Sequence, residues 1–438
     1  MDVMLPWGKQ DFMNIALPKS WNFQREILPD DFRPLTDMKQ MLDQSLENPI
    51  DQVPLSARSL PGCKIAVIVD DVSRPTPVHL IFPEVMKRLL SAGAEIAKIT
   101  VVVSLGTHSS MGEKEICARL GTKEWGQFPV INHNCYQDQM LANLGKTSGG
   151  AEIIVNRHVC EADLIISIGT IEPHLLAGFG GGLKNIIPGC AGIKTIGATH
   201  LMGPASKRFS GVGKMGEECP TRLMIEEGAA KVPGEILLIN TVLNVKGEPV
   251  GVFCGEPVKA HREGCRLAEK IYGSLVPEKA DVMITGSHPM DIDLRQATKC
   301  LANASGALKE DGLLIALMRC SNGIGDMKIP EYFLPAAFMR TFAKECGTER
   351  MVDIREQFSQ EMNLDEKYML QFLTEMAKRH QVLVYAPAIP AETGTKLGVF
   401  ELFSDIHDLL KRAIELMPEA KVVYSMPYGG ISYAFCRD

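Results

Sequence analysis

The run Lys64-Ile65-Ala66-Val67-Ile68-Val69-Asp70 decides the fold class of this chain. It is a continuous apolar, mostly β-branched stretch that ends in an acid, which is typical of a strand buried on both faces of a parallel sheet. Residues 77–92 follow it with Ile81, Val85 and Leu89 at helical spacing. A buried strand that leads into an amphipathic helix indicates a βαβ unit.

The same alternation of strands and helices continues along the chain. We expect further strands at residues 99–105, 163–169, 236–243, 281–285, 312–318, 382–386 and 421–425, and further helices at residues 259–272, 365–378 and 404–417. Strands that alternate with helices at this rhythm predict right-handed crossovers and mostly parallel sheets. The fold class is therefore α/β.

The length of 438 residues exceeds what one hydrophobic core supports, so we expect two α/β domains. Residues 274–279 have the composition of a linker, and a new series of strands and helices starts after them. We therefore place residues 1–275 in one domain and residues 276–438 in the other. We expect the active site in the cleft between them, and the last residues of the chain packed back on the first domain.

The composition argues against several classes of protein. With 46 basic and 53 acidic side chains the net charge is -7, so nucleic acid is not an expected partner. Apolar runs such as residues 313–318 are far shorter than the roughly 18 residues that cross a membrane. Residues 1–9 lack the basic start and apolar core of a signal peptide, which favours a cytoplasmic location. The 12 cysteines form no C-x-x-C pair, so no zinc ribbon is encoded.

The densest group of candidate functional residues lies in residues 171–189. Gly180, Gly181 and Gly182 precede Lys184, and such a loop can let backbone N–H groups approach an anion while the lysine adds charge or a nucleophilic amine. The segment is not a P-loop, because leucine precedes the lysine and asparagine follows it. The alternative is a glycine-rich turn with a solvated lysine.

Three histidines fall in or near the expected strand-end loops of the first domain: His108, His174 and His200. Histidine titrates near neutral pH and is the usual general acid or base, although a lone histidine in a loop is more often a surface residue. His200 is a candidate metal ligand, but one histidine cannot hold a metal ion by itself.

Two polar clusters are candidate binding segments. Asp71, Ser73 and Arg74 follow the first strand, where they could bind a polar ligand or merely form a capped turn. In the second domain, residues 295–299 bring Arg295, Gln296 and Lys299 onto adjacent helical turns, where they could grip a carboxylate or form a solvated helix face. These residues alone predict a two-domain α/β enzyme, but they do not identify its reaction.

Five motifs in order give the sequence a specific resemblance. They are Asp70-Asp71-Val72-Ser73-Arg74-Pro75, Gly106-Thr107-His108, Glu172-Pro173-His174, Ala177-Gly178-Phe179-Gly180-Gly181-Gly182-Leu183-Lys184 with Pro188-Gly189, and Thr199-His200. In this order and spacing the chain resembles the nickel-pincer lactate racemase family through the first domain. Residues 281–317 resemble it more loosely.

The resemblance implies a nickel-pincer nucleotide, pyridinium-3-thioamide-5-thiocarboxylate mononucleotide nickel. Lys184 matches the lysine that is linked to this cofactor, and His200 matches the histidine that completes the nickel coordination. One protein histidine is then sufficient, because the cofactor supplies the other three donors. The family also implies loading by separate cofactor biosynthesis proteins. The positions that match cofactor-binding residues are Asp71, Ser73, Arg74, Gly180, Gly181 and Gly182.

The family resemblance also implies the reaction, which is inversion of a 2-hydroxy acid. Hydrogen leaves C2 as hydride to the cofactor, and it returns to the other face of the planar 2-oxo acid. His108 and His174 match the catalytic pair and would exchange base and acid roles for the two enantiomers. The positions near the substrate are Arg74, Ser109, Arg295, Gln296 and Lys299.

The chain departs from the family pattern at three places, two of which bear on the substrate. Ser109 replaces an arginine after the loop histidine, and Arg295 replaces a tyrosine before the glutamine. We therefore expect a 2-hydroxy acid that is larger or more polar than lactate. Residues 219–222, Cys-Pro-Thr-Arg, replace an Asn-Pro-His pattern, for which the sequence offers no explanation. The alternatives are a sugar-acid epimerase with the same cofactor and a non-catalytic cofactor carrier.

Overall fold

A computed structural model describes residues 1–8, 10–122, 128–205, 211–325, 327, 336–348, 350 and 364–437. The chain forms two compact units. Unit 1 contains Met1–Asp30, Gly203–Gly213 and Tyr272–Asp438, and unit 2 contains Asp31–Met202 and Lys214–Ile271. In the described residues, no helix combines the length and apolar character that crossing a membrane would require.

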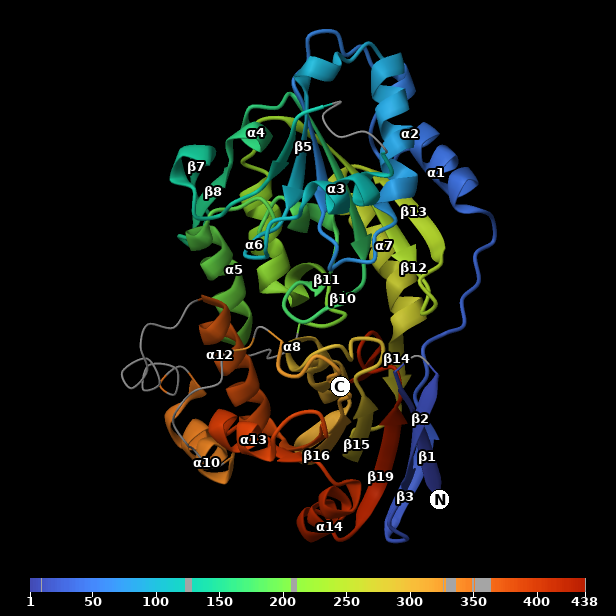
Figure 1. Ribbon diagram of the computed structural model, residues 1–438, viewed down its shortest axis with the longest axis vertical. Coiled ribbons are helices and arrows are strands. Elements are labelled where there is room, and N and C mark those ends of the chain that lie inside the picture. Colours follow the sequence, from blue (N-terminus) through green and yellow to red (C-terminus); the bar gives the residue numbers. More distant parts are fainter. Residues whose placement is uncertain are drawn as a thin grey trace. The chain divides into compact units, whose positions relative to one another are not determined.

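Six strands of unit 2 form one sheet in the order β13-β12-β9-β4-β5-β6. Figure 1 labels β5, β12 and β13 of this sheet. The parallel strands are β4 (Ile65–Asp70), β5 (Ile99–Ser104), β6 (Val130–Asn132), β9 (Leu164–Ile171) and β12 (Glu235–Leu243). Only β13 (Pro249–Gly255) runs antiparallel within this sheet. After β4 the chain continues to β5 on one side, and it later returns to β9 on the other side. The neighbours β4 and β9 therefore form the topological switch point, which is where open α/β sheets bind ligands.

The remaining elements that begin in unit 2 surround this sheet. The helices are α1 (Met38–Glu47), α2 (Val78–Ser91), α3 (Glu113–Leu120), α4 (Arg157–Cys160), α5 (Ile193–Ala205), α6 (Pro220–Ala229) and α7 (Pro257–Tyr272). Two antiparallel pairs are formed by β7 (Leu141–Lys146) with β8 (Glu152–Asn156) and by β10 (Pro173–His174) with β11 (Gly178–Phe179).

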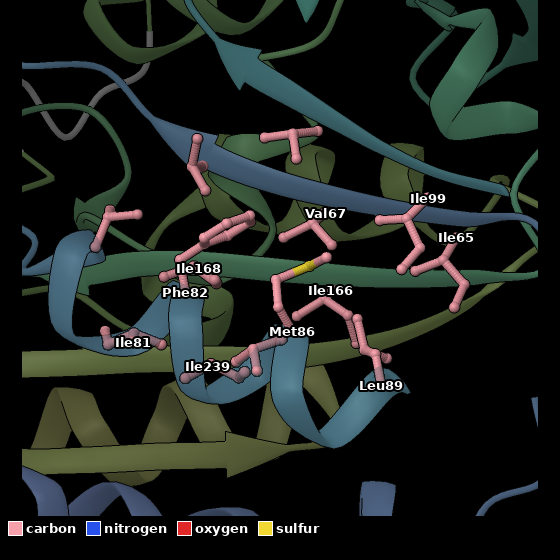
Figure 2. Packing of buried hydrophobic residues seen from close by; sticks show 14 of the residues in the cluster. Ile65, Val67, Ile81, Phe82, Met86, Leu89, Ile99, Ile166, Ile168 and Ile239 are labelled. Atoms are coloured by element: carbon pink, nitrogen blue, oxygen red, sulfur yellow. The ribbon is translucent and has the colours of Figure 1, made fainter. Parts of the chain in front are cut away.

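The core of unit 2 forms where α2 packs on the sheet. Every residue of β4 is buried, as expected for a strand that is covered on both faces. Phe82 and Met86 point from α2 toward the strands, where Val67 and Ile166 lie in the same buried cluster (Figure 2). Burying each such side chain stabilises the fold by roughly 1.5–3 kcal/mol, so this face of α2 fixes the helix against the sheet.

Unit 1 has a second six-stranded sheet, in the order β18-β17-β16-β15-β19-β3, and all of its pairs are parallel. Its strands are β3 (Trp21–Glu26), β15 (Ala280–Gly286), β16 (Leu308–Leu317), β17 (Gln381–Tyr385), β18 (Glu401–Phe403) and β19 (Ala420–Met426). The described helices are α8 (Leu294–Ala297), α9 (Lys299–Ser305), α10 (Ala336–Cys346), α12 (Leu364–Arg379), α13 (Ala391–Leu397) and α14 (Ile406–Leu416). The predicted α/β class with mostly parallel sheets is confirmed.

The N-terminal residues Met1–Asp30 belong to unit 1 together with Tyr272–Asp438, although residues 1–275 were expected to form one domain. β3 pairs with β19, and the hairpin of β1 (Asp2–Trp7) and β2 (Asp11–Ala16) contributes Val3 and Ile15 to the core around β15. The pairing of β3 with β19, about 400 residues away, could not be read from the sequence, because strands so far apart carry no local sign of which partner they pair with.

The segment expected as a linker is partly a strand. β14 (Gly273–Val276) pairs in parallel with β20 (Tyr433–Cys436) inside unit 1, so the last described residues of the chain form a small sheet there. The four residues of β14 are too few to show a periodicity of strand type.

Candidate active site

A pocket in unit 2 lies at the carboxyl ends of β4, β5 and β9, at the switch point of the sheet. The loops that follow these strands line it together with the glycine-rich segment and α5. Eight of the residues predicted from the sequence line this pocket: Asp71, Arg74, His108, His174, Gly180, Gly181, Lys184 and His200. The structure therefore brings the five sequence motifs to one place.

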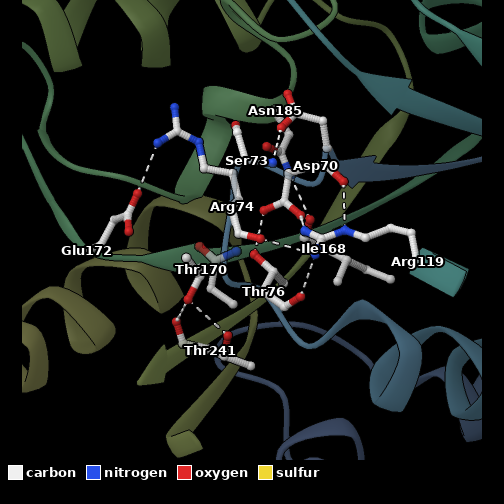
Figure 3. A network of polar contacts seen from close by, with 12 residues as sticks. Asp70, Ser73, Arg74, Thr76, Arg119, Ile168, Thr170, Glu172, Asn185 and Thr241 are labelled. Carbon is white, nitrogen blue, oxygen red and sulfur yellow. Dashed lines mark hydrogen bonds and ion pairs between the residues drawn. The ribbon is translucent and has the colours of Figure 1, made fainter. Parts of the chain in front are cut away.

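Arg119 on α3 organises the loop that follows β4 (Figure 3). Its guanidinium pairs with the Asp70 carboxylate and donates to the carbonyls of Asp70, Arg74 and Thr76 at 3.0, 3.1 and 2.9 Å. The Thr76 hydroxyl donates to the other Asp70 oxygen at 2.5 Å. Burial outweighs these contacts and raises the pKa of Asp70 to about 6. The planar guanidinium fixes the backbone from which Asp71 and Arg74 reach the pocket.

Asp71 orients His108. Its Oδ2 lies 2.7 Å from Nδ1 of His108, and its Oδ1 accepts the backbone N–H of Ser73 at 2.6 Å. Burial opposes the charge on Asp71, but the hydrogen bond and charge of His108 together with Ser73 lower the pKa of Asp71 to about 2. The carboxylate is therefore ionised and can only accept hydrogen bonds, so Nδ1 of His108 carries the proton.

The ionised Asp71 is expected to stabilise the fold above pH 4. Its pKa is about 2 in the folded chain against an ordinary 3.8, so the unfolded chain takes up a proton first as the pH falls. The contribution is about 2 kcal/mol above pH 4 and falls by roughly 1 kcal/mol between pH 6 and pH 3. Urea unfolding of wild type and Asp71→Asn across this range measures it. A difference between the two proteins that does not change with pH would contradict this assignment, and Asp138→Asn, at an exposed position, is the control.

Arg74 and Glu172 form an ion pair at the pocket (Figure 3). Nη1 of Arg74 lies 3.0 Å from Oε1 of Glu172, and Glu172 is 7% exposed. Burial opposes the charge of Arg74, but Glu172, Asp71 and Asp70 outweigh it and raise the pKa of Arg74. The guanidinium is thus held in place as a fixed positive charge. Glu172 was quoted in the family motif, but its role as the partner of Arg74 could not be read from the sequence.

His174 is held by the turn that follows it. Its Nδ1 accepts the backbone N–H groups of Leu176 and Ala177, each at 3.2 Å. A nitrogen that accepts two N–H donors carries no proton, so the neutral imidazole has its proton on Nε2.

The glycine-rich loop is anchored by buried side chains beneath it. Arg222 on α6, which is 1% exposed, donates to the carbonyls of Ala177 and Gly181, each at 3.2 Å, and to that of Phe179. His261 on α7 donates from Nε2 to the Gly180 carbonyl at 2.8 Å, and its burial, together with the charge of Arg222, holds its pKa well below the usual range. Within residues 219–222, Arg222 therefore binds three carbonyls of the loop.

The glycines allow this loop to pack closely against its neighbours in the protein. The N–H groups of Gly180 and Gly182 donate to the carbonyl of Glu172 and to Oδ1 of Asn240, both at 2.6 Å, so they are used within the protein. A Cβ on Gly181, whose φ is +65°, would lie 2.5 Å from Oδ1 of Asn240. At Gly181 the loop can therefore approach β12 only without a side chain.

Replacing Arg222 with alanine is expected to cost about 3 kcal/mol of unfolding free energy, because it removes a fully buried side chain and three hydrogen bonds to the loop, although the carbonyls of Ala177 and Gly181 keep the N–H groups of Phe179 and Lys184. Arg222→Lys should recover only part of this, since an ammonium lacks the planar fork. Urea unfolding measures both variants. Arg266→Ala, which removes a side chain that is 60% exposed on α7, should change stability by less than about 0.5 kcal/mol. Equal effects of Arg222→Ala and Arg266→Ala would rule out this anchoring role.

Lys184 and His200 reach the pocket from two different elements. The backbone N–H of Lys184 donates to the Gly181 carbonyl at 3.3 Å, and this carbonyl is also bound by Arg222. Nδ1 of His200 lies 2.9 Å from the Ile196 carbonyl one turn earlier in α5. A carbonyl only accepts, so Nδ1 of His200 carries the proton and Nε2 has the lone pair that a metal requires.

The other predicted site residues lie elsewhere. Ser73 contributes its backbone N–H to Asp71, Gly182 faces His261 below the loop, and Ser109 is an exposed neighbour of His108. Arg295 and Gln296 on α8 and Lys299 on α9 belong to unit 1, after β15, and their part in substrate binding stays a prediction. Within the described residues, no group of three or more His, Cys, Asp or Glu side chains is arranged to hold a metal ion.

Two family models match most of the chain. Residues 7–210 match the model of the lactate racemase N-terminal domain, and residues 276–433 match that of the lactate racemase C-terminal domain. The chain is 27% identical over 403 residues to the lactate racemase of Lactiplantibacillus plantarum, with 89% of each chain covered. It is 25% identical over 348 residues to the lactate racemase of Thermoanaerobacterium thermosaccharolyticum, with 79% of each covered.

Two solved structures share the fold. The lactate racemase apoprotein from Thermoanaerobacterium thermosaccharolyticum superposes with a TM-score of 0.82 at 23% identity and full coverage of both chains. A protein from Thermotoga maritima gives a TM-score of 0.63 at 18% identity, covering 94% of this chain and 100% of that one. Together with the two domain models, these matches show that the chain belongs to the lactate racemase family.

Proposed function

We propose that this chain is an isomerase that racemises or epimerises 2-hydroxy acids. The observation that carries the proposal is the meeting of His108, His174, Lys184 and His200 in one pocket at the switch point of unit 2. Membership of the lactate racemase family supports it, because both curated relatives are named lactate racemase.

The residues of the pocket fit the nickel-pincer nucleotide of the family. Lys184 offers an amine for covalent attachment, and His200 has an Nε2 lone pair, since its Nδ1 is engaged with the Ile196 carbonyl. A metal-bound histidine normally donates its second ring N–H to a carbonyl or carboxylate in this way. When bound, the cofactor would supply nickel and an electrophilic carbon that takes the C2 hydrogen of the substrate as hydride and returns it. Loading would require the separate biosynthesis proteins.

Side chains of unit 2 would then transfer the proton of the substrate hydroxyl and bind the substrate carboxylate. Nε2 of His108, which is free of a proton when Nδ1 donates to Asp71, would take the proton of the substrate hydroxyl. His174 would serve the hydroxyl of the opposite configuration. Arg74, held by Glu172, would keep a positive charge near the substrate carboxylate or the nucleotide phosphate.

The substrate that we propose is larger or more polar than lactate. Ser109 is smaller than the arginine of the lactate enzymes, and Arg295 adds a cation where they have tyrosine. A dicarboxylate or a sugar acid would fit the space beside the smaller Ser109 and could bind the added cation of Arg295. Epimerisation of a sugar acid is the second candidate function.

The proposal is tested with protein loaded by coexpression with the cofactor biosynthesis proteins. Single enantiomers of lactate, of 2-hydroxy dicarboxylates and of aldonic acids are incubated with it, and the products are separated by chiral chromatography. We expect inversion of at least one polar acid at a higher kcat/KM than that of lactate. Loaded protein that inverts no member of the panel would favour the carrier alternative.

A further inference from the structure

The two histidines of the pocket have opposite hydrogen-bond environments at the same ring atom. Nδ1 of His108 faces a carboxylate oxygen of Asp71 at 2.7 Å. Nδ1 of His174 faces two backbone N–H donors, those of Leu176 and Ala177, at 3.2 Å each. A carboxylate requires a donor at Nδ1, whereas N–H groups require an acceptor there.

We infer that the protein holds its two histidines in opposite neutral tautomers, His108 with the proton on Nδ1 and His174 with the proton on Nε2, and that Asp71 is the positioning residue for His108. The inference deepens the proposed function, because it assigns different starting roles to the pair. The tautomers themselves are a property of the protein without cofactor.

The first consequence concerns His108, which starts as the base. Its Nε2 has a lone pair, so the O–H bond of the substrate can break with the proton bonding to Nε2 and the electron pair staying on the substrate oxygen. The imidazolium formed is stabilised by Asp71, which remains ionised because its pKa is about 2. This side of the pocket needs no rearrangement.

The second consequence concerns His174, which starts as a hydrogen-bond donor through Nε2–H. Before Nε2 of His174 can take a proton from the substrate, it must lose its own proton to water and Nδ1 must gain one from water, and the N–H groups of Leu176 and Ala177 then have to move away from Nδ1. Residues 175–177 therefore shift when His174 acts as base, whereas the loop of Asp71 and His108 stays in place. One enantiomer of the substrate is therefore deprotonated without a change in the pocket, and the other requires residues 175–177 to shift.

Nitrogen NMR of the unloaded protein with 15N-labelled histidine tests the inference. Long-range couplings from the ring carbon protons identify the protonated nitrogen at pH 8, and His108→Gln and His174→Gln assign the two signals by their loss. We expect Nε2 of His108 and Nδ1 of His174 to be the bare nitrogens. The same tautomer in both residues would overturn the inference and leave the proposed function standing, since no cofactor or turnover is involved.

Asp71→Asn tests the positioning role. The Ser73 N–H binds Oδ1 of Asp71, so an asparagine there should keep its oxygen toward Ser73 and turn its NH2 toward Nδ1 of His108. The proton of His108 should then move to Nε2 while the His174 signal is unchanged, and turnover of the loaded enzyme should fall about 10⁴-fold, as for the same change in a serine-protease triad. Asp138→Asn should alter neither signal. An unchanged His108 tautomer in Asp71→Asn would refute the role of Asp71.

Discussion

Replacing Lys184 with alanine is expected to abolish both attachment of the cofactor and turnover. The covalent link would require the side-chain amine, whereas alanine keeps the backbone contacts of this residue, whose N–H binds the Gly181 carbonyl and whose carbonyl binds the N–H of Gly189. Intact-mass spectrometry and nickel analysis after coexpression with the biosynthesis proteins measure attachment directly.

Two further variants separate attachment from charge. Lys184→Arg keeps a cation in the pocket but cannot form the same link, so it should also lack the adduct. Lys194→Ala removes a lysine on α5 whose side chain is 73% exposed, and it should load as wild type does. Racemisation by Lys184→Ala would show that the lysine loop serves another ligand.

The second large effect concerns the histidine pair. His108→Gln and His174→Gln should each keep the mass of the adduct and the nickel, because Lys184 would form the covalent link and His200 would bind the nickel. Turnover should fall by about 10²- to 10⁴-fold in each, which is the usual range for loss of a general acid or base. The comparison of adduct and rate in one preparation distinguishes a catalytic role from a binding role.

A matched control for these variants is His407→Gln, at an exposed position of α14 in unit 1. It should leave both adduct and turnover unchanged. If His108→Gln or His174→Gln turned over as fast as His407→Gln, that histidine would have no part in proton transfer.

Four strands of the main sheet of unit 2, namely β4, β5, β9 and β12, were predictable because they carry the signal locally, whereas β6 and β13 of the same sheet were not expected. β4, β5 and β9 are buried runs of β-branched residues, and no other local structure buries such runs as well. β3 and β14 were not predictable, since β3 has exposed polar residues and β14 has only four residues. Their identity as strands depends on partners far away in the sequence.

In the site, too, the sequence predicted local features but not the contacts between distant residues. The loops after β4, β5 and β9 could be located from the sequence, and the family motifs gave the residue types in them. What the sequence could not supply was the partner of each side chain. Arg222 comes from a helix that follows the glycine loop by about 40 residues, and the opposed contacts of His108 and His174 depend on hydrogen-bond geometry.

The central claim is that hydrogen leaves and returns to C2 as hydride within one pocket, and isotope retention tests it most directly. Loaded protein is incubated in ordinary water with a single enantiomer of a 2-hydroxy acid that carries deuterium at C2, and the inverted product is analysed by mass spectrometry. We expect the product to retain its deuterium, because hydride held by the cofactor does not exchange with water. Product that contains protium at C2 would mean that a base removes this hydrogen as a proton, which would contradict the account.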